Sequence, residues 1–153
     1  MIKKAQLSEA AQIADLIRAS IRSCIEDHNN DPHAIEQWLE NKTEENVRQW
    51  IIENFAWVFK QQNEVQGIIL VSPKAEILLN YVAPKSQGQG IGRKLLNQTK
   101  QVYLQKGIGS LTAESTLTAR PFYLANGFKV VEEVFEAGKL VAYKMSLTLE
   151  QHK

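Results

Sequence analysis

The sequence predicts an α/β sandwich in which helices flank a mixed, largely antiparallel sheet of about seven strands. Two observations lead to this class. Helical periodicity dominates the first third of the chain, and strand-like segments dominate the remainder. The last two strands follow each other as a hairpin and no regular strand–helix alternation is present, which excludes a doubly wound parallel sheet. No linker or repeat interrupts the 153 residues, so we expect a single domain, residues 1–153.

The first third of the chain is expected to be mainly helical after one short strand. Apolar residues spaced three and four apart predict an amphipathic helix that Ser8 would cap. A polar stretch indicates a loop, and Thr43 is a second helix cap. The expected elements are strand 2–6, helix 8–24, loop 26–32, helix 33–40 and helix 44–54.

The middle of the chain should hold three consecutive strands and one long helix. Short runs of β-branched and aromatic residues, separated by polar or proline-containing turns, predict the strands. The helix follows a glycine-rich turn and ends at Gly107. The expected elements are strands 55–60, 65–71 and 76–83 and helix 90–106, whose buried stripe would be Ile91, Leu95, Thr99 and Val102.

The last third should contain a strand, a short helix and a hairpin. Proline is tolerated in the first turn of a helix and glycine often ends one, so Pro121 and Gly127 predict a short helix. Two strand-like runs joined around residues 137–138 predict the hairpin. The expected elements are strand 110–115, helix 118–126 and strands 128–135 and 140–149.

Composition and charge exclude several classes of function. The formal net charge is +1, which disfavours a general nucleic-acid binder. No apolar run approaches the roughly 20 residues that span a bilayer, and no signal-peptide core follows the N-terminus. Cys24 is the only cysteine and the histidines lack zinc-site spacing. We therefore expect a cytoplasmic protein with no metal, no membrane partner and no nucleic acid.

A glycine-rich turn between an expected strand and an expected helix is the first candidate site. Glycines let a backbone approach a ligand closely, and the free N–H groups of a helix N-terminus attract anions. The spacing matches neither a Walker loop nor a dinucleotide fingerprint. A pyrophosphate site is expected, with a plain strand-to-helix turn as the alternative. The candidate residues are Gln87, Gly88, Gln89, Gly90, Ile91, Gly92, Arg93 and Lys94.

Two segments match motifs that occur together in one enzyme superfamily. The turn fits Q/R-x-x-G-x-G/A through Gln87, Gly90 and Gly92. The segment TARPFYLANGF fits A-x-x-F-Y-x-x-x-G-F, with Tyr123 at the tyrosine position. In this order, and with this strand pattern, the segments resemble the GNAT superfamily of N-acetyltransferases from about Phe55 to Phe128. The resemblance implies a GNAT-like fold and acetyl-CoA as co-substrate.

The resemblance also implies how acetyl-CoA would bind. In that superfamily the amides of the glycine loop bind the CoA pyrophosphate. The backbone of the preceding strand, here Tyr81, Val82 and Ala83, pairs with the pantetheine arm. The amide of Val82 would then face the thioester carbonyl. Many members carry an asparagine where this chain has Thr116, and the hydroxyl of Thr116 is expected to contact the cofactor instead.

Direct attack of an amine on a thioester needs an oxyanion donor, an acid for the thiolate and a base for the ammonium. By the resemblance, Tyr123 is the general acid, with a core aromatic residue as the alternative. Glu76 is the candidate base, because it falls where the histone-acetylating branch has its glutamate. Strand alternation would place it on the same face as Asn80 and Val82. A solvated Glu76, with Glu114 or a chain of waters as the base, is the alternative.

The acceptor pocket is expected near residues 26–31, where the superfamily usually builds it between the first two helices. The carboxylates of Asp27 and Asp31 could attract a cationic amine. His28, Trp38 and Asn80 could line the pocket. The alternatives are solvated loop residues and, for Trp38, a core residue.

The expected function is transfer of an acetyl group from acetyl-CoA to a primary amine. A small-molecule amine is favoured over a protein N-terminus or a lysine, and a homodimer is possible. One alternative is a non-catalytic CoA-binding module of the same fold. Another is a phosphate- or nucleotide-binding domain that uses the glycine turn alone.

Overall fold

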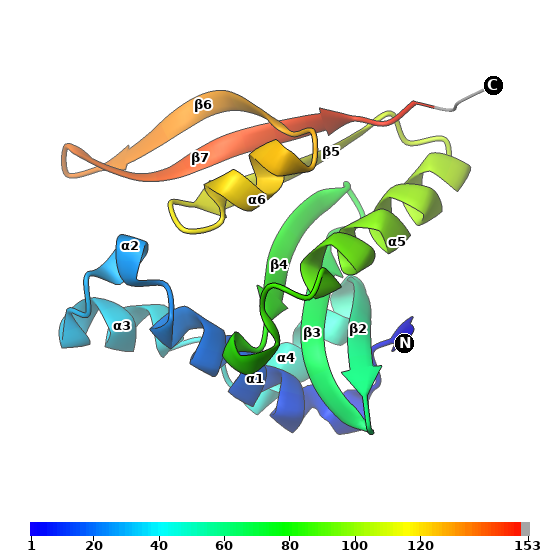
Figure 1. Cartoon of the computed structure of the whole chain (residues 1–153), viewed down its shortest axis with the longest axis horizontal. Helices are drawn as coiled ribbons and strands as arrows, with labels where there is room; N and C mark the ends of the chain where they lie inside the picture. Colours follow the sequence, from blue (N-terminus) through cyan, green and yellow to red (C-terminus); the bar gives the residue numbers. More distant parts are fainter. Residues whose placement is uncertain (151–153) are drawn as a thin grey trace.

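The computed structural model describes residues 1–150 (Figure 1), whose elements follow the expected order except for the extra short helix α2 and two 3-10 turns. The predicted fold class, a single α/β domain with a seven-stranded, mostly antiparallel sheet, is confirmed. The strands are β1 (Ile2–Lys4), β2 (Phe55–Gln61), β3 (Glu64–Val71), β4 (Glu76–Val82), β5 (Ser110–Thr116), β6 (Lys129–Glu136) and β7 (Lys139–Thr148). The helices are α1 (Ala10–Arg22), α2 (Ile25–His28), α3 (Pro32–Leu39), α4 (Glu44–Glu53), α5 (Ile91–Gln105) and α6 (Arg120–Ala125), with 3-10 turns η1 (Leu7–Glu9) and η2 (Pro84–Ser86).

The sheet has the strand order β1-β2-β3-β4-β5-β7-β6, and β4 and β5 are the one parallel pair in the part of the chain that the structure describes. Within residues 1–150 these two strands pair at two positions, Glu76 with Thr112 and Ile77 with Ala113. Beyond them the strands part, and Figure 1 shows β2–β4 and β5–β7 as two separate groups. We call the segments 78–82 and 114–116 the β4–β5 fork. The fork leaves one edge of β4 open in the middle of the sheet.

Helices cover both faces of the first half of the sheet. On one face lies the α1 cluster, centred on Ile13, Ile17, Val58, Ile68 and Leu70. On the other lies the α5 cluster, centred on Ile69, Val71, Leu95, Leu96 and Tyr103, which also includes Tyr123 of α6. Alternate residues of β3 enter the two clusters because successive strand side chains point to opposite faces.

The start of α1 differs from the prediction. Ser8 does not cap the helix, because the chain first forms the turn η1. The turn η1 starts with a capping box, in which the Gln6 N–H donates to the Glu9 carboxylate at 2.9 Å. The same buried carboxylate pairs with Lys60 at 2.8 Å. Local helix-capping patterns in the sequence cannot predict this contact, because it joins η1 to a distant strand.

The predicted loop 26–32 contains the short helix α2, and α3 begins at Pro32. The His28 ring holds this segment together. Its Nε2 donates to the Ile21 carbonyl at 2.9 Å, and its Nδ1 accepts from the Asn30 N–H at 3.0 Å. Asn29 and Asn30 have φ values of 51° and 58°, which asparagine tolerates better than most residues.

The remaining helices agree closely with the predictions. Thr43 caps α4 by accepting from the Asn46 N–H at 3.1 Å. In α5 the predicted stripe is buried except for Val102, which is partly exposed. The neighbouring Tyr103 is buried instead, and its hydroxyl donates to the Ser72 carbonyl at 3.0 Å. None of the helices in residues 1–150 has the length and apolar character needed to cross a membrane.

Candidate active site

The glycine turn has the shape that anion binding requires. Gly88 and Gly90 have φ values of 81° and 80°, in the left-handed region that favours glycine. A Cβ added at either residue would meet no other atom within 4 Å, so the space beside the turn is open. Gly90 is the N-cap of α5, and the N–H groups of the first helical turn have no partner within the helix. Backbone donors therefore surround an accessible space.

Of the two cations that follow the turn, Lys94 is directed elsewhere. Its ammonium lies 5.4 Å from the centroid of the Phe59 ring, on β2. Arg93 is exposed on the first turn of α5. We therefore expect Arg93 to contribute more positive charge to an anion at the turn than Lys94.

Gly92 brings three elements together. A Cβ at this position would lie 3.3 Å from Phe122 of α6 and 3.6 Å from Val82 of β4. The start of α5, the end of β4 and the face of α6 therefore approach one another at Gly92. The predicted pyrophosphate site and the predicted general acid Tyr123 lie on adjoining elements.

The open edge of β4 presents free backbone groups. The Ala83 N–H donates to the Gln66 carbonyl at 2.8 Å, which makes these residues a hydrogen-bonded pair of the β3–β4 ladder. Hydrogen-bonded and non-bonded pairs alternate in an antiparallel ladder. Asn80 and Val82 are therefore non-bonded pairs with β3, and their N–H groups point into the fork.

The carbonyl of Val82 is already occupied. It accepts from the Ser20 hydroxyl at 2.5 Å and from the Gln87 amide at 3.3 Å. Ser20 is a buried residue of α1 that was not predicted as part of the site. A polar residue inside the apolar stripe of α1 was the signal that could have pointed to it.

Glu76 is separated from Asn80 and Val82 by a β-bulge in β4. The register shifts so that Leu70 pairs with Leu79 but Val71 pairs with Ile77. As a result Ile77 belongs to the α5 cluster, whereas Leu79 packs against the α1 cluster. An extra residue reverses strand alternation.

The expectation that Glu76 shares a face with Asn80 and Val82 is therefore corrected. Glu76 is exposed and pairs with Thr112, where β4 and β5 are still together. With the bulge between them, it lies three ladder positions, roughly 10 Å, along the strand from Asn80. The structure does not bring Glu76 together with Tyr123. Glu114, the alternative base, is an exposed residue of β5 opposite Lys144.

Tyr123 is buried, with 5% of its surface exposed, between Phe122 and Phe128. Burial raises the pKa of Tyr123 to about 12, and the Asn80 side chain beside it offsets part of the rise. The hydroxyl is therefore protonated at neutral pH. The Oδ1 atom of Asn80 is buried and has no hydrogen-bond partner within residues 1–150. A buried polar atom without a partner in the fork is suited to a ligand N–H.

Thr116 stands at the end of β5, on the other arm of the fork. Its hydroxyl oxygen accepts from the Ala119 N–H at 3.1 Å and so fixes the turn into α6. The hydroxyl can still donate a hydrogen bond of its own. Thr116 is thus located beside the fork, with its hydroxyl already engaged as an acceptor.

The two carboxylates predicted to attract an acceptor are both bound within the protein. Asp27 accepts from the N–H groups of Leu117 and Thr118 at 2.7 and 3.1 Å, and also from the Thr118 hydroxyl. Asp31 caps α3 by accepting from the His33 N–H at 3.2 Å. Neither is a free anionic group on a mobile loop.

The aromatic residues predicted for the pocket, His28 and Trp38, lie against each other behind the α1–α2 corner. His28 is 3% exposed, has partners on both ring nitrogens, and meets Trp38 edge-on at 6.2 Å between centroids. Burial raises the pKa of Tyr81, and Trp38 beside it has a smaller opposite effect. Burial, with Asp27 nearby, raises the pKa of Cys24 to about 11, so this thiol is protonated at neutral pH.

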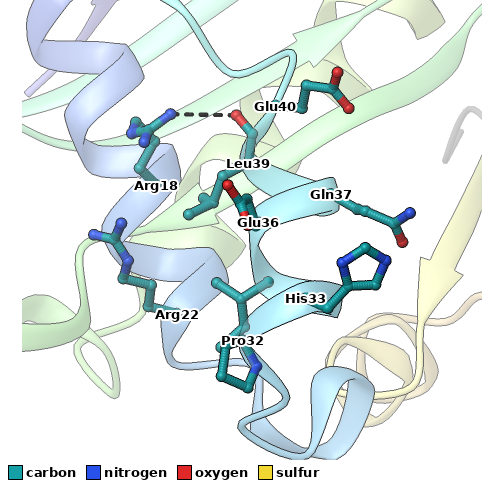
Figure 2. A pocket seen from close by; sticks show the side chains of 9 residues that line it. Arg18, Arg22, Pro32, His33, Glu36, Gln37, Leu39 and Glu40 are labelled. Carbon is teal, nitrogen blue, oxygen red and sulfur yellow. Dashed lines mark hydrogen bonds between the residues drawn. The ribbon is translucent and has the colours of Figure 1, made fainter.

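A separate groove of about 840 Å³ lies between α1 and α3 (Figure 2). Arg18 and Arg22 line one side, and Arg18 donates to the Leu39 carbonyl at 3.2 Å. Glu36 and Glu40 lie along the other. None of the predicted site residues lines this groove, so it is not part of the fork.

Comparison with known proteins agrees with this geometry. The family model described as acetyltransferase (GNAT) domain matches residues 24–149. Solved structures of the same fold include a GCN5-related N-acetyltransferase, "Aminotransferase, Class-II", from Rhodopseudomonas palustris, with a TM-score of 0.86 and 20% identity over 97% of this chain and 95% of that one. The PaiA N-acetyltransferase from Thermoplasma acidophilum, solved with coenzyme A, has a TM-score of 0.84 and 20% identity, over 97% of this chain and 98% of that one. Aminoglycoside 6'-acetyltransferase type Ii has a TM-score of 0.74 and 18% identity, over 100% of this chain and 99% of that one.

A search of curated protein sequences found no significant match. The family model nevertheless spans most of the chain. The chain belongs to the GNAT acetyltransferase family, and it is an acyltransferase enzyme. The family and the enzyme class expected from the two motifs are confirmed.

Proposed function

We propose that this enzyme transfers an acetyl group from acetyl-CoA to a primary amine by direct attack on the thioester. The observation that carries the proposal is the open edge of β4. It offers the N–H groups of Asn80 and Val82 between the glycine turn on one side and Tyr123 on the other. An extended pantetheine arm fits such an edge as an added strand would.

The glycine turn would hold the pyrophosphate. Its open space, its left-handed glycines and the first N–H groups of α5 suit two linked phosphates. Arg93 would add charge from the first turn of the helix. The PaiA enzyme of the same fold was solved with coenzyme A, which supports this choice of ligand.

The reaction follows from the groups around the fork. The amine nitrogen attacks the thioester carbon, and the oxyanion that forms accepts from a β4 N–H group. As the carbon–sulfur bond breaks, the sulfur takes the proton of Tyr123, which solvent then restores. We assign the proton of the ammonium to water, because Glu76 is exposed and the bulge turns it away from the face of Asn80 and Val82. The products are an amide and free CoA.

A small molecule is the acceptor that we favour. The aminoglycoside 6'-acetyltransferase shares the fold along the whole chain, and its name specifies an aminoglycoside, a small molecule, as acceptor. The alternative is a non-catalytic CoA-binding module. Release of CoA from acetyl-CoA in the presence of a library of primary amines separates the two. The cytoplasmic location and the homodimer stay predictions.

The cofactor site is tested by Gly90→Asp. The new carboxylate would project into the open space beside the turn and repel the pyrophosphate. Isothermal titration with CoA should show a loss of affinity of at least about tenfold, or roughly 1.4 kcal/mol. Gly138→Asp is the matched control, because Gly138 has a φ of 78° and equally open surroundings, in the β6–β7 turn. Equal CoA affinity in both folded variants would refute the site.

A further inference from the structure

The corner between α1 and α2 bonds to both arms of the β4–β5 fork. On the β4 side, the Ser20 hydroxyl donates to the Val82 carbonyl at 2.5 Å. On the β5 side, Asp27 accepts from Leu117 and Thr118, the two residues that follow β5. Leu117 and Thr118 lie 90 and 91 positions after Asp27 in the chain. One short segment, residues 20–27, therefore spans the open end of the fork, and Figure 1 shows α2 extending toward the β7 and α6 side.

The corner is built to be stiff. His28 bonds back to the Ile21 carbonyl and forward to the Asn30 N–H, so α2 is fixed to the end of α1. Cys24 is buried and its thiol contacts the Ser20 carbonyl at 3.3 Å. A displacement of the Asp27 carboxylate would therefore move the whole corner.

The other end of the contact leads directly to Tyr123. Thr118 precedes Ala119, whose N–H is held by Thr116 and whose carbonyl accepts the Tyr123 N–H at 3.2 Å. Three hydrogen bonds that Asp27 accepts thus secure the turn that starts α6. Bonds from N–H and hydroxyl groups to an ionised acceptor are stronger than neutral ones.

We propose that Asp27 is a positioning residue that sets the separation between the β4 edge and Tyr123. The inference rests on the proposed acetyl transfer, because the thioester would lie between these two groups. It replaces the expectation that Asp27 binds the acceptor directly. A fork held at fixed width keeps the Tyr123 hydroxyl within reach of the departing sulfur, and small misplacements are costly in such sites.

The contact itself is tested without any substrate. Hydrogen exchange of the Leu117, Thr118 and Tyr123 amides should become at least about tenfold faster in Asp27→Ala. Glu26→Ala is the control, because Glu26 is exposed on the same helix and has the same charge. Unchanged exchange at Leu117 and Thr118 would overturn the contact, and faster exchange there with an unchanged Tyr123 amide would overturn the positioning role.

Kinetics then test the consequence, with 1,4-diaminobutane and kanamycin as probe amines. Asp27→Ala should lower the single-turnover rate by at least about tenfold and change CoA affinity by less than about twofold. Asp27→Asn retains one acceptor oxygen and should recover part of the rate. Thr118→Val removes the hydroxyl bond, and its effect should vanish in the Asp27→Ala background. An unaltered rate in Asp27→Ala would refute the proposal. If the wild type acetylates neither amine, the proposed acceptor class fails, while the exchange experiment still decides the role of Asp27.

Discussion

At the scale of single residues, burial decides what each polar side chain of the site can do. Tyr123 keeps its proton at neutral pH because burial of the residue raises its pKa to about 12. Asn80 has a buried oxygen that lacks a partner in the part of the chain that the structure describes. Asp27 and His28, by contrast, have all their strong contacts inside the protein. The first two residues are therefore available to a ligand, and the last two shape the site.

Tyr123→Phe tests the general acid. The ring is retained, so packing against Phe122 and Phe128 should survive. A positioned general acid contributes about 10²–10⁴-fold, and single-turnover rates should fall within that range. CoA affinity should change little. Because burial raises the pKa of Tyr123, the phenol stays protonated, and the wild-type rate should not fall through its ionisation at neutral or mildly alkaline pH. A folded Tyr123→Phe variant with the wild-type rate would reduce Tyr123 to a packing residue.

At the scale of elements, two local irregularities shape the proposed cofactor site. The bulge at Leu78 adds one residue to β4 and so reverses the alternation of side chains beyond it. Asn80 and Val82 therefore lie on the opposite face of the sheet from Glu76, whereas simple alternation would place all three on one face. The close approach of α5 to β3 is made possible by Gly67. A Cβ there would lie 2.8 Å from Ile91 and 3.0 Å from Leu95. The helix that carries the glycine turn is thus seated directly on the sheet.

Gly67→Ala should therefore disturb the seat of α5. The new methyl group meets the β-branched Ile91 side chain, which cannot rotate away freely, so the helix start must shift. We expect a loss of about 1–3 kcal/mol in the free energy of unfolding, measured with urea. Gly109→Ala is the control, since a Cβ there meets nothing within 4 Å and its φ is ordinary. Equal stability of the two variants would show that α5 is not held by this contact.

At the scale of the whole molecule, the sheet is two groups of strands joined at the base of the fork. Two residue pairs connect β4 with β5, while β5 and β7 pair at seven positions. A ligand that lies in the fork and contacts both arms should therefore stabilise the complete chain.

Thermal unfolding in the presence of nucleotides tests this. CoA at about one hundred times its dissociation constant should stabilise the fold by about 2.7 kcal/mol. For a chain of this size that corresponds to a rise in Tm of roughly 5–10 °C. ATP and NAD at equal concentration should give smaller shifts, because they lack the pantetheine arm that would pair with β4. Equal shifts with all three would favour a general nucleotide-binding site at the glycine turn.

The sequence by itself determined both motifs and the order of the strands and of the helices other than α2. Periodicity sets which residues form helices and strands. Gly88 and Gly90 occupy left-handed backbone positions that glycine adopts with little strain. The resemblance to the GNAT superfamily also predicted roles for Tyr123 and for the edge of β4. These features are local, since each depends on residues close together in the chain.

Only the tertiary structure decided which side chains meet. One bulge separated Glu76 from the face of Asn80, and contacts across 62 and 90 residues assigned Ser20 to Val82 and Asp27 to the turn before α6. The physical reason is that a hydrogen bond between distant segments depends on how complete layers pack, and local sequence patterns carry no record of that packing.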